Sequence, residues 1–144
     1  MTQTASQALA AATFKSDGVT YRLLRLPSNA ITAAAGVVAE IGEPFCAMVV
    51  DSREVSLILP AAAVENFRAR LPDVDVADEI CKLITINVVM EPELTGLVAA
   101  VSAALADAGI PLLPFASFSR DHLLVMAEHA DEALAVLRGL QRQG

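Results

Sequence analysis

The sequence predicts an α+β fold of two tandem modules, each with the element order βαββαβ, packed together. Short apolar runs with alternating side chains, typical of strands, are separated by Ala-rich and Leu-rich segments with helical spacing. This order occurs once over residues 14–78 and again over residues 79–144. Each half is small for an independent hydrophobic core, so we expect the two modules to pack against each other.

The first module is predicted from the weaker patterns. Two arginines within the alternating segment TYRLLRLP indicate a strand with one solvated face. Ser28 or Asn29 is placed to cap the helix that follows, and the polar link 51–53 between two apolar runs indicates a hairpin. The expected strands are residues 20–27, 45–50 and 54–60, the expected helices are residues 30–40 and 60–71, and residues 72–79 are expected to form a solvated connection.

The second module has the clearest strand and helix of the chain. Apolar residues alternate along KLITINVVM, and Gly109 is placed for a left-handed cap at the end of the next helix. Pro111 and Pro114 lack a backbone donor, so their strand is expected at a sheet edge or a bulge. The expected strands are residues 82–90, 110–117 and 122–126, and the expected helices are residues 94–108 and 128–140.

Composition and charge exclude several classes of partner. Hydrophobic residues make up 55% of the 144 residues, and the formal net charge is −7 with scattered basic residues. Nucleic acid and anionic membrane surfaces require clustered Lys and Arg, so neither is expected as a partner. The apolar segment 94–113 is interrupted by Asp107, Gly109 and Pro111, which favours a helix followed by a strand over a membrane span.

The cysteines and the N-terminal segment favour a cytoplasmic location. Cys46 and Cys81 lie in apolar runs and are expected to be buried, without forming a disulfide framework. Residues 1–13 lack the basic and apolar regions of a secretory signal.

Catalysis is not expected. Ser119, Asp121 and His122 suggest a hydrolytic triad, but neighbours on a strand point to opposite faces, so Asp121 is not expected to orient His122. The sequence contains no G-x-S-x-G elbow and no phosphate-binding glycine loop. His122 and His129 have no partner at metal-ligand spacing, and we therefore expect no catalytic residues, no metal and no cofactor.

The segment from Leu83 to Leu140 resembles an ACT domain. The resemblance rests on an apolar strand followed by Thr95-Gly96-Leu97, on AGI at the helix end (residues 108–110), and on the hairpin SFSRDHLLV (residues 117–125). The resemblance implies a ferredoxin-like fold. The chain is similar to small tandem ACT proteins, among them cytosolic arginine sensors, and to the regulatory regions of aspartate kinase. The implied partners are an amino acid or a similar small metabolite, and a second copy of the chain in a homodimer.

The candidate binding site lies where the second module's first strand enters its helix. Free backbone N–H groups at a helix start bind a carboxylate, Gly96 allows close approach, and Thr95 adds a hydroxyl. Glu91 and Glu93 offer partners for an amino or guanidinium group, and residues 115–119 offer the opposite wall, across a module or subunit interface. The candidate ligand-binding residues are Met90, Glu91, Glu93, Leu94, Thr95, Gly96, Phe115, Ser117, Phe118 and Ser119.

Structural roles compete with this interpretation. The two glutamates also suit solvated acids at a helix start, Thr95 and Gly96 suit helix packing, and the serines suit a turn. The sequence therefore predicts a regulatory protein that binds an amino-acid-type effector. The alternative is a protein–protein interaction or oligomerisation module without a ligand, for which a flat apolar patch is expected in place of a polar hollow.

Overall fold

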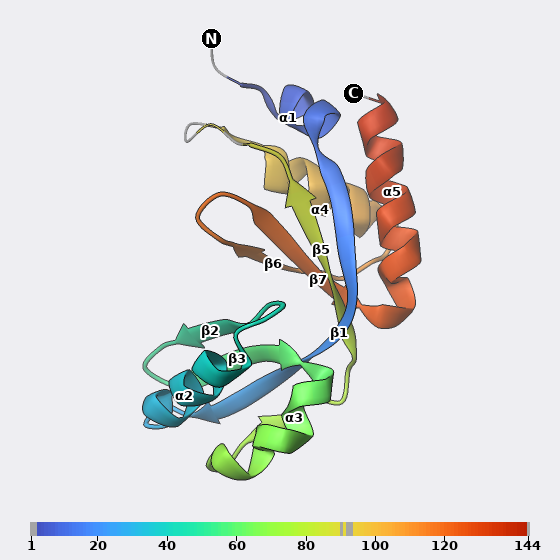
Figure 1. Cartoon of the computed structure of the whole chain (residues 1–144). Helices are drawn as coiled ribbons and strands as arrows, with labels where there is room; N and C mark the ends of the chain where they lie inside the picture. The colour runs from blue at the N-terminus through green and yellow to red at the C-terminus, as the bar shows by residue number, and fades with distance from the viewer. Residues whose placement is uncertain (1–2, 90, 92–93, 144) are drawn as a thin grey trace. The chain divides into compact units, whose positions relative to one another are not determined.

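The computed structural model describes residues 3–89, 91 and 94–143, and the chain divides into two compact units (Figure 1). The contiguous unit is Val19–Cys81, and the composite unit joins Met1–Gly18 to Lys82–Gly144. Strand β1 (Thr13–Pro27) crosses the division, so each unit receives part of it. Both units combine strands with helices, which confirms the predicted α+β class. No helix within the described ranges is long and apolar enough to cross a membrane.

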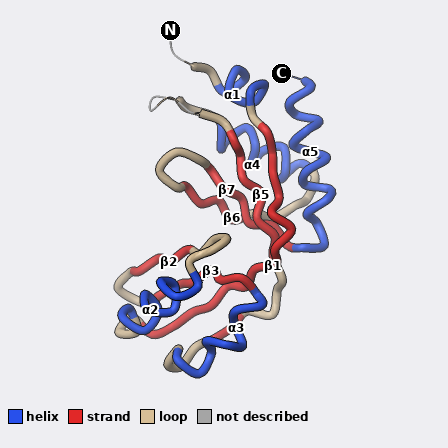
Figure 2. The backbone as a smooth tube through the Cα atoms, viewed as in Figure 1, coloured by secondary structure: helices blue, strands red, loops and turns tan. Residues whose placement is uncertain are grey.

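The contiguous unit is an antiparallel sheet with two helices on one face (Figure 2). Its strands lie in the order β2-β3-β1-β4. Alternate residues of β1 and β3, among them Leu24 and Leu57, turn toward α2 and α3 and form the core with Val37 and Val64. After β1, the elements are α2 (Ile31–Ile41), β2 (Ala47–Val50), β3 (Glu54–Pro60), α3 (Ala61–Phe67), the 3-10 helix η1 (Arg68–Arg70) and β4 (Asp75–Val76).

Three details of this unit differ from the sequence prediction. The expected connection 72–79 contains β4, where Asp75 pairs with Arg25 of β1 and their side chains form an ion pair at 2.8 Å. Neither Ser28 nor Asn29 caps α2, since Ala30 takes the N-cap position without a side-chain bond. Cys46 is only half-buried, whereas Cys81 is buried as expected.

The composite unit has the strand order β1-β5-β7-β6, with helices α1, α4 and α5 packed together. Its core joins one face of β5 and β7, including Ile84 and Leu123, to Leu105 of α4 and Leu137 of α5. The elements besides β1 are α1 (Ala5–Ala11), β5 (Cys81–Asn87), α4 (Leu97–Asp107), β6 (Leu113–Ala116), β7 (Asp121–Met126), the 3-10 helix η2 (Ala127–His129) and α5 (Ala130–Gln143).

Helix α1 was not expected from the sequence. The side chains of Thr4 and Gln7 form a capping box at its start. Leu9 is buried in the core, and the Gln141 side chain of α5 donates to the carbonyls of Leu9 and Ala12 at 2.7 and 2.6 Å. A local cap and packing onto α4 and α5 therefore define this short helix.

The ends of α4 are set by two glycines. Gly96 has φ +87° and is the N-cap, so the helix begins at Leu97 and not at the expected Leu94. Gly109 has φ +74°, which confirms the expected left-handed cap. There the Gly109 amide donates to the Ala106 carbonyl, and the Ile110 amide donates to the Leu105 carbonyl, the pattern of a Schellman motif.

Candidate functional site

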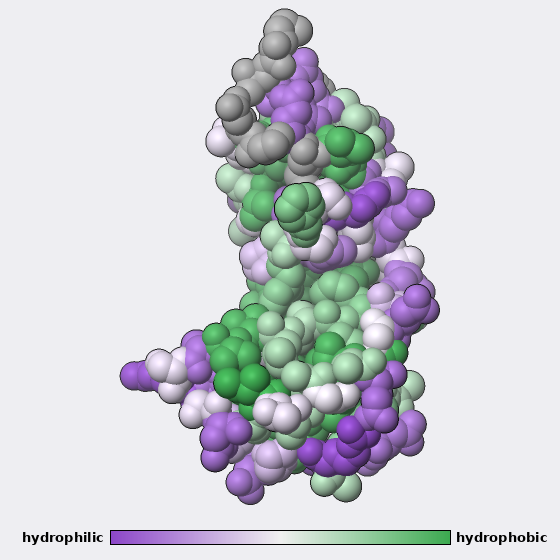
Figure 3. All heavy atoms as spheres, turned by 60° about the vertical axis from the view of Figure 1, so that its left-hand side comes forward, coloured by the Kyte–Doolittle hydropathy of each residue, from purple (hydrophilic) through white to green (hydrophobic). Residues whose placement is uncertain are grey.

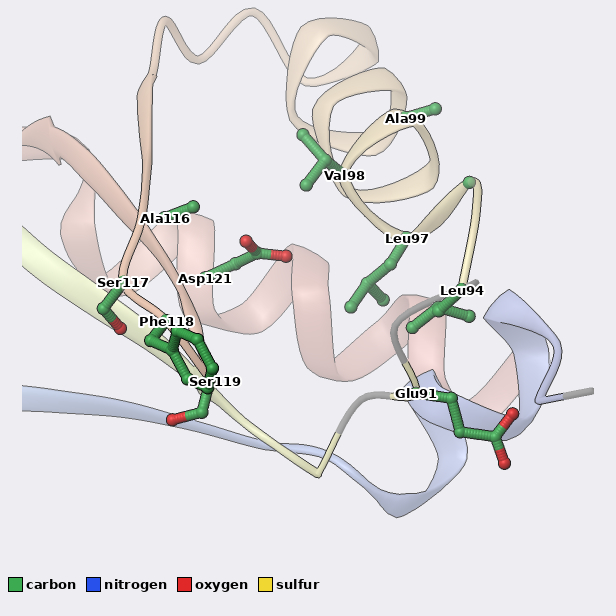
Figure 4. A pocket seen from close by; sticks show the side chains of 11 residues that line it. Glu91, Leu94, Leu97, Val98, Ala99, Ala116, Ser117, Phe118, Ser119 and Asp121 are labelled. Atoms are coloured by element: carbon green, nitrogen blue, oxygen red, sulfur yellow. The ribbon is translucent and has the colours of Figure 1, made fainter.

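A cavity of about 360 Å³ lies in the composite unit between the start of α4 and the β6–β7 hairpin (Figure 4). One wall is the segment that leads into α4 and its first turn, and the other is the hairpin. The lining residues are Glu91, Leu94, Gly96, Leu97, Val98, Ala99, Ala116, Ser117, Phe118, Ser119 and Asp121.

The α4 wall presents unpaired backbone donors. No side chain among the described residues caps the helix, and its first turn contains no acidic residue. The first intrahelical bond in this turn runs from the Ala100 amide to the Gly96 carbonyl, so the amides of Leu97, Val98 and Ala99 precede the helical ladder. Together with the helix dipole, these amides make this wall weakly positive.

The hairpin wall is held by a chain of hydrogen bonds. The Ser117 hydroxyl donates to the Arg120 carbonyl at 3.1 Å, so it accepts from His122 Nε2 at 3.2 Å. His122 Nδ1 lies 2.9 Å from the Thr85 hydroxyl of β5, and in the neutral ring it accepts a hydrogen bond from that hydroxyl. A neutral imidazole with its proton on Nε2 is compatible with both contacts. Because Ser117 has committed its only proton, it offers the cavity a lone pair.

Burial lowers the pKa of His122 below its ordinary value. The negative charge of Asp121 opposes this shift, and the positive charge of Arg120 adds to it. The surroundings therefore favour the neutral ring, which is compatible with both of its hydrogen bonds.

Of the two carboxylates at the cavity, only Glu91 has a hydrogen-bond partner among the described residues. Glu91 Oε2 accepts a hydrogen bond from the backbone amide of Gln3 at 2.7 Å, which ties the N-terminal segment to the entry of α4. Asp121 forms no hydrogen bond or ion pair through its side chain with any residue that the structure describes. The hairpin cation, Arg120, does not line the cavity, because its Nε donates to Asn87 Oδ1 at 2.8 Å.

Residues 76–139 match the family model of the ACT domain, which spans β5, α4, β6, β7 and most of α5. These residues form an ACT domain. The resemblance predicted for Leu83–Leu140 is thereby confirmed, and the whole cavity lies within the matched residues.

Similarity to solved structures extends over more of the chain than the residues matched by the ACT family model. A Vibrio cholerae protein of unknown function, described as a possible transport protein, shares 21% identity at a TM-score of 0.73, with 94% of each chain covered. An Agrobacterium tumefaciens protein shares 22% identity at a TM-score of 0.68, covering 90% of this chain and 89% of that one. The ligand-free regulatory subunit of aspartate kinase from Thermus thermophilus shares 16% identity at a TM-score of 0.71, covering 90% and 98%.

These structural similarities establish the ferredoxin-like α+β fold of ACT proteins. No protein with a curated function gave a significant match.

The structure brings together many of the residues predicted for the binding site of the ACT domain. Thr95 is exposed and Phe115 is half-buried, and neither lines the cavity. Met90 and Glu93 lie outside the described residues. The predicted residues that line it are Glu91, Leu94, Gly96, Ser117, Phe118 and Ser119.

Sequence reasoning missed Asp121 as a lining residue. It also missed Leu97, Val98 and Ala99. Strand alternation places Asp121 and His122 on opposite faces, and this was a signal that pointed to separate roles for them. Within the described ranges, no group of three or more His, Cys, Asp or Glu residues is arranged to hold a metal ion.

Proposed function

We propose that this chain is a regulatory protein that binds a small effector of amino-acid type in the cavity of its ACT domain and performs no catalysis itself. One observation carries the proposal. Within the ACT match, one cavity has helix amides on one wall and a carboxylate on the other, and no described side chain caps those amides or pairs with that carboxylate. These two walls complement the carboxylate and the ammonium group of an amino acid.

The cavity also fits such a ligand in size and character. Its volume of about 360 Å³ is within the range of small-molecule sites. Leu94, Leu97 and Val98 supply apolar surface, while Ser117 and Asp121 supply the few polar groups that fix orientation.

Structural similarity to a regulatory protein supports the proposed regulatory role. The aspartate kinase subunit from Thermus thermophilus is a regulatory chain, and nearly all of its length is covered. We extend the proposal to two ACT-like modules in tandem, residues 14–78 and 79–144. The strand order β2-β3-β1-β4 of the contiguous unit corresponds position by position to β6-β7-β5-β1 of the composite unit. In the composite unit, the start of β1 takes the place of a fourth strand.

A thermal-shift screen of the purified chain against the twenty amino acids tests the proposal. A ligand at a hundred times its dissociation constant stabilises the folded state by about 2.7 kcal/mol, so a selective rise in Tm is expected. Ala99→Trp fills the cavity and should abolish the rise. Ala106→Trp, exposed on the same helix and outside the cavity, should retain it. If no amino acid raises Tm, the proposal that the chain binds an amino-acid-type effector is wrong.

Self-association is the second candidate function, and strand β2 favours it. Among the described strands, β2 pairs with β3 alone, and its residues Met48, Val49 and Val50 are 38%, 49% and 44% exposed. Figure 3 shows hydrophobic residues gathered on the face of the contiguous unit that carries β2. An apolar edge strand of this kind pairs readily with another chain, and a second copy of this protein is the proposed occupant.

A further inference from the structure

We propose that His122 is a positioning residue of the effector site and that protonation of its ring weakens effector binding. This inference rests on the proposed function and adds to it a regulatory signal, the pH. His122 does not line the cavity, but its Nε2 lies 3.2 Å from the hydroxyl of Ser117, which does (Figure 4). The ring therefore acts on a bound effector through Ser117.

The imidazole of His122 is held in place by both strands that flank β7. On one side, its Nδ1 lies 2.9 Å from the Thr85 hydroxyl of β5, and on the other, His122 pairs with Phe115 of β6. The Ser117 hydroxyl in turn donates to the Arg120 carbonyl at 3.1 Å. The position of the Ser117 oxygen in the cavity wall is thus set by one backbone carbonyl and by this ring.

Protonation of His122 places a positive charge directly behind the hairpin wall. A neutral imidazole donates from one nitrogen and accepts at the other, whereas the protonated ring donates from both and carries the charge. The proposed effector presents its ammonium group to the same wall, so the two positive charges would repel each other across Ser117. Apolar side chains on the opposite wall, Leu97 and Val98, reduce the screening of this repulsion by water.

The surroundings of His122 allow its charge to change without unfolding either wall of the cavity. Burial lowers the pKa of His122, the negative charge of Asp121 raises it, and the positive charge of Arg120 lowers it. The strands on either side face the ring with Thr85 and Phe115, which carry no charge. Carboxyl groups ordinarily titrate near about pH 4, so a change in affinity between pH 8 and pH 5 reports chiefly on histidine.

Calorimetric titration at pH 8 and at pH 5 tests this proposal. The probes are the twenty amino acids, screened by thermal shift at both pH values, and the one that raises Tm most is titrated. Its dissociation constant is expected to be roughly fivefold higher or more at pH 5. His122→Gln keeps a donor for Ser117 but cannot become charged, so it should bind with nearly equal affinity at the two pH values. His129→Gln, outside the cavity lining, should retain the wild-type dependence.

NMR titration of the imidazole signals gives a second measurement that needs no folded variant. Because coupling between two binding events is reciprocal, saturation with the same amino acid should lower the pKa of His122. The chain has two histidines, so His129 provides the reference signal in the same spectra.

The outcomes separate this inference from the proposed function. If an amino acid binds with equal or higher affinity at pH 5, if its affinity falls equally in His122→Gln, or if it leaves the pKa of His122 unchanged, the proposal is wrong and effector binding still stands. If no amino acid raises Tm at either pH, the proposed function fails together with this inference.

Discussion

His122 has hydroxyl groups at both ring nitrogens, Thr85 at Nδ1 and Ser117 at Nε2. The ring joins β5 to the hairpin that forms one wall of the cavity. A neutral ring suits this role, because the acceptor nitrogen toward Thr85 disappears on protonation. The hydrogen bonds that join β5 to the hairpin therefore depend on the charge of the His122 imidazole.

Stability should fall as the pH drops through the titration of His122. Its folded pKa is lowered by burial, so the unfolded chain binds the proton more readily. The stabilising contribution is fully present above the unfolded value of about 6.5 and is lost as the pH falls from there through the folded pKa. Urea unfolding at pH 8 and pH 5 measures it. His122→Gln should reduce the difference, whereas His129→Gln should preserve it.

Part of this residue-level chemistry follows from sequence. Strand alternation correctly indicates that Asp121 does not orient His122, but it contains no information on what either side chain meets. The partner of His122 on β5 and the cavity beside Asp121 come from strand neighbours distant in the chain. Gly96 was interpreted through close approach, yet a Cβ there would meet only Ala5 at 3.7 Å, and its positive φ is the stronger requirement.

At the scale of elements, α1 completes the core of the composite unit although it comes from the start of the chain. Leu9 is 5% exposed and belongs to the same core as Ile84 and Leu105. Leu9→Ala is expected to lower the free energy of unfolding by about 2–4 kcal/mol, because it removes buried methyl groups and leaves a void.

Denaturant unfolding of Leu9→Ala beside Leu113→Ala checks this prediction. Leu113 lies on β6 and is 44% exposed, so its loss should change stability by only about 0.5 kcal/mol. Similar losses for the two variants would show that α1 contributes little to this core.

The spacing of apolar residues predicted the helices and strands that bury one regular face. It did not predict the strands that depend on pairing with neighbouring strands. The helices and hairpins of both halves lie close to their expected positions, because their apolar residues repeat with the correct period. The start of β1, TFKSDG, has a single buried side chain, Phe14, and β4 has only two residues. Their strand conformation depends on pairing with neighbouring strands, and the intrinsic β propensity of a residue does not include this contribution.

For the whole molecule, the exposed edge of β2 predicts a homodimer in solution. Val49→Lys places a charge on this edge and should convert the dimer to a monomer in sedimentation velocity experiments. Leu113→Lys places the same charge on the β6 edge of the composite unit and should leave the dimer intact. The reverse result would assign the interface to β6, and a monomeric wild type would contradict self-association.

Because β1 contributes to both units, the residues of the composite unit are not synthesised as one continuous stretch. Residues Val19–Cys81 leave the ribosome as a continuous stretch that holds every strand and helix of its own unit. The first eighteen residues emerge earlier, yet the rest of their unit, residues 82–144, is translated only after the contiguous unit. Leu9 and Phe14 therefore lack the core partners of their own unit while residues 19–81 are synthesised.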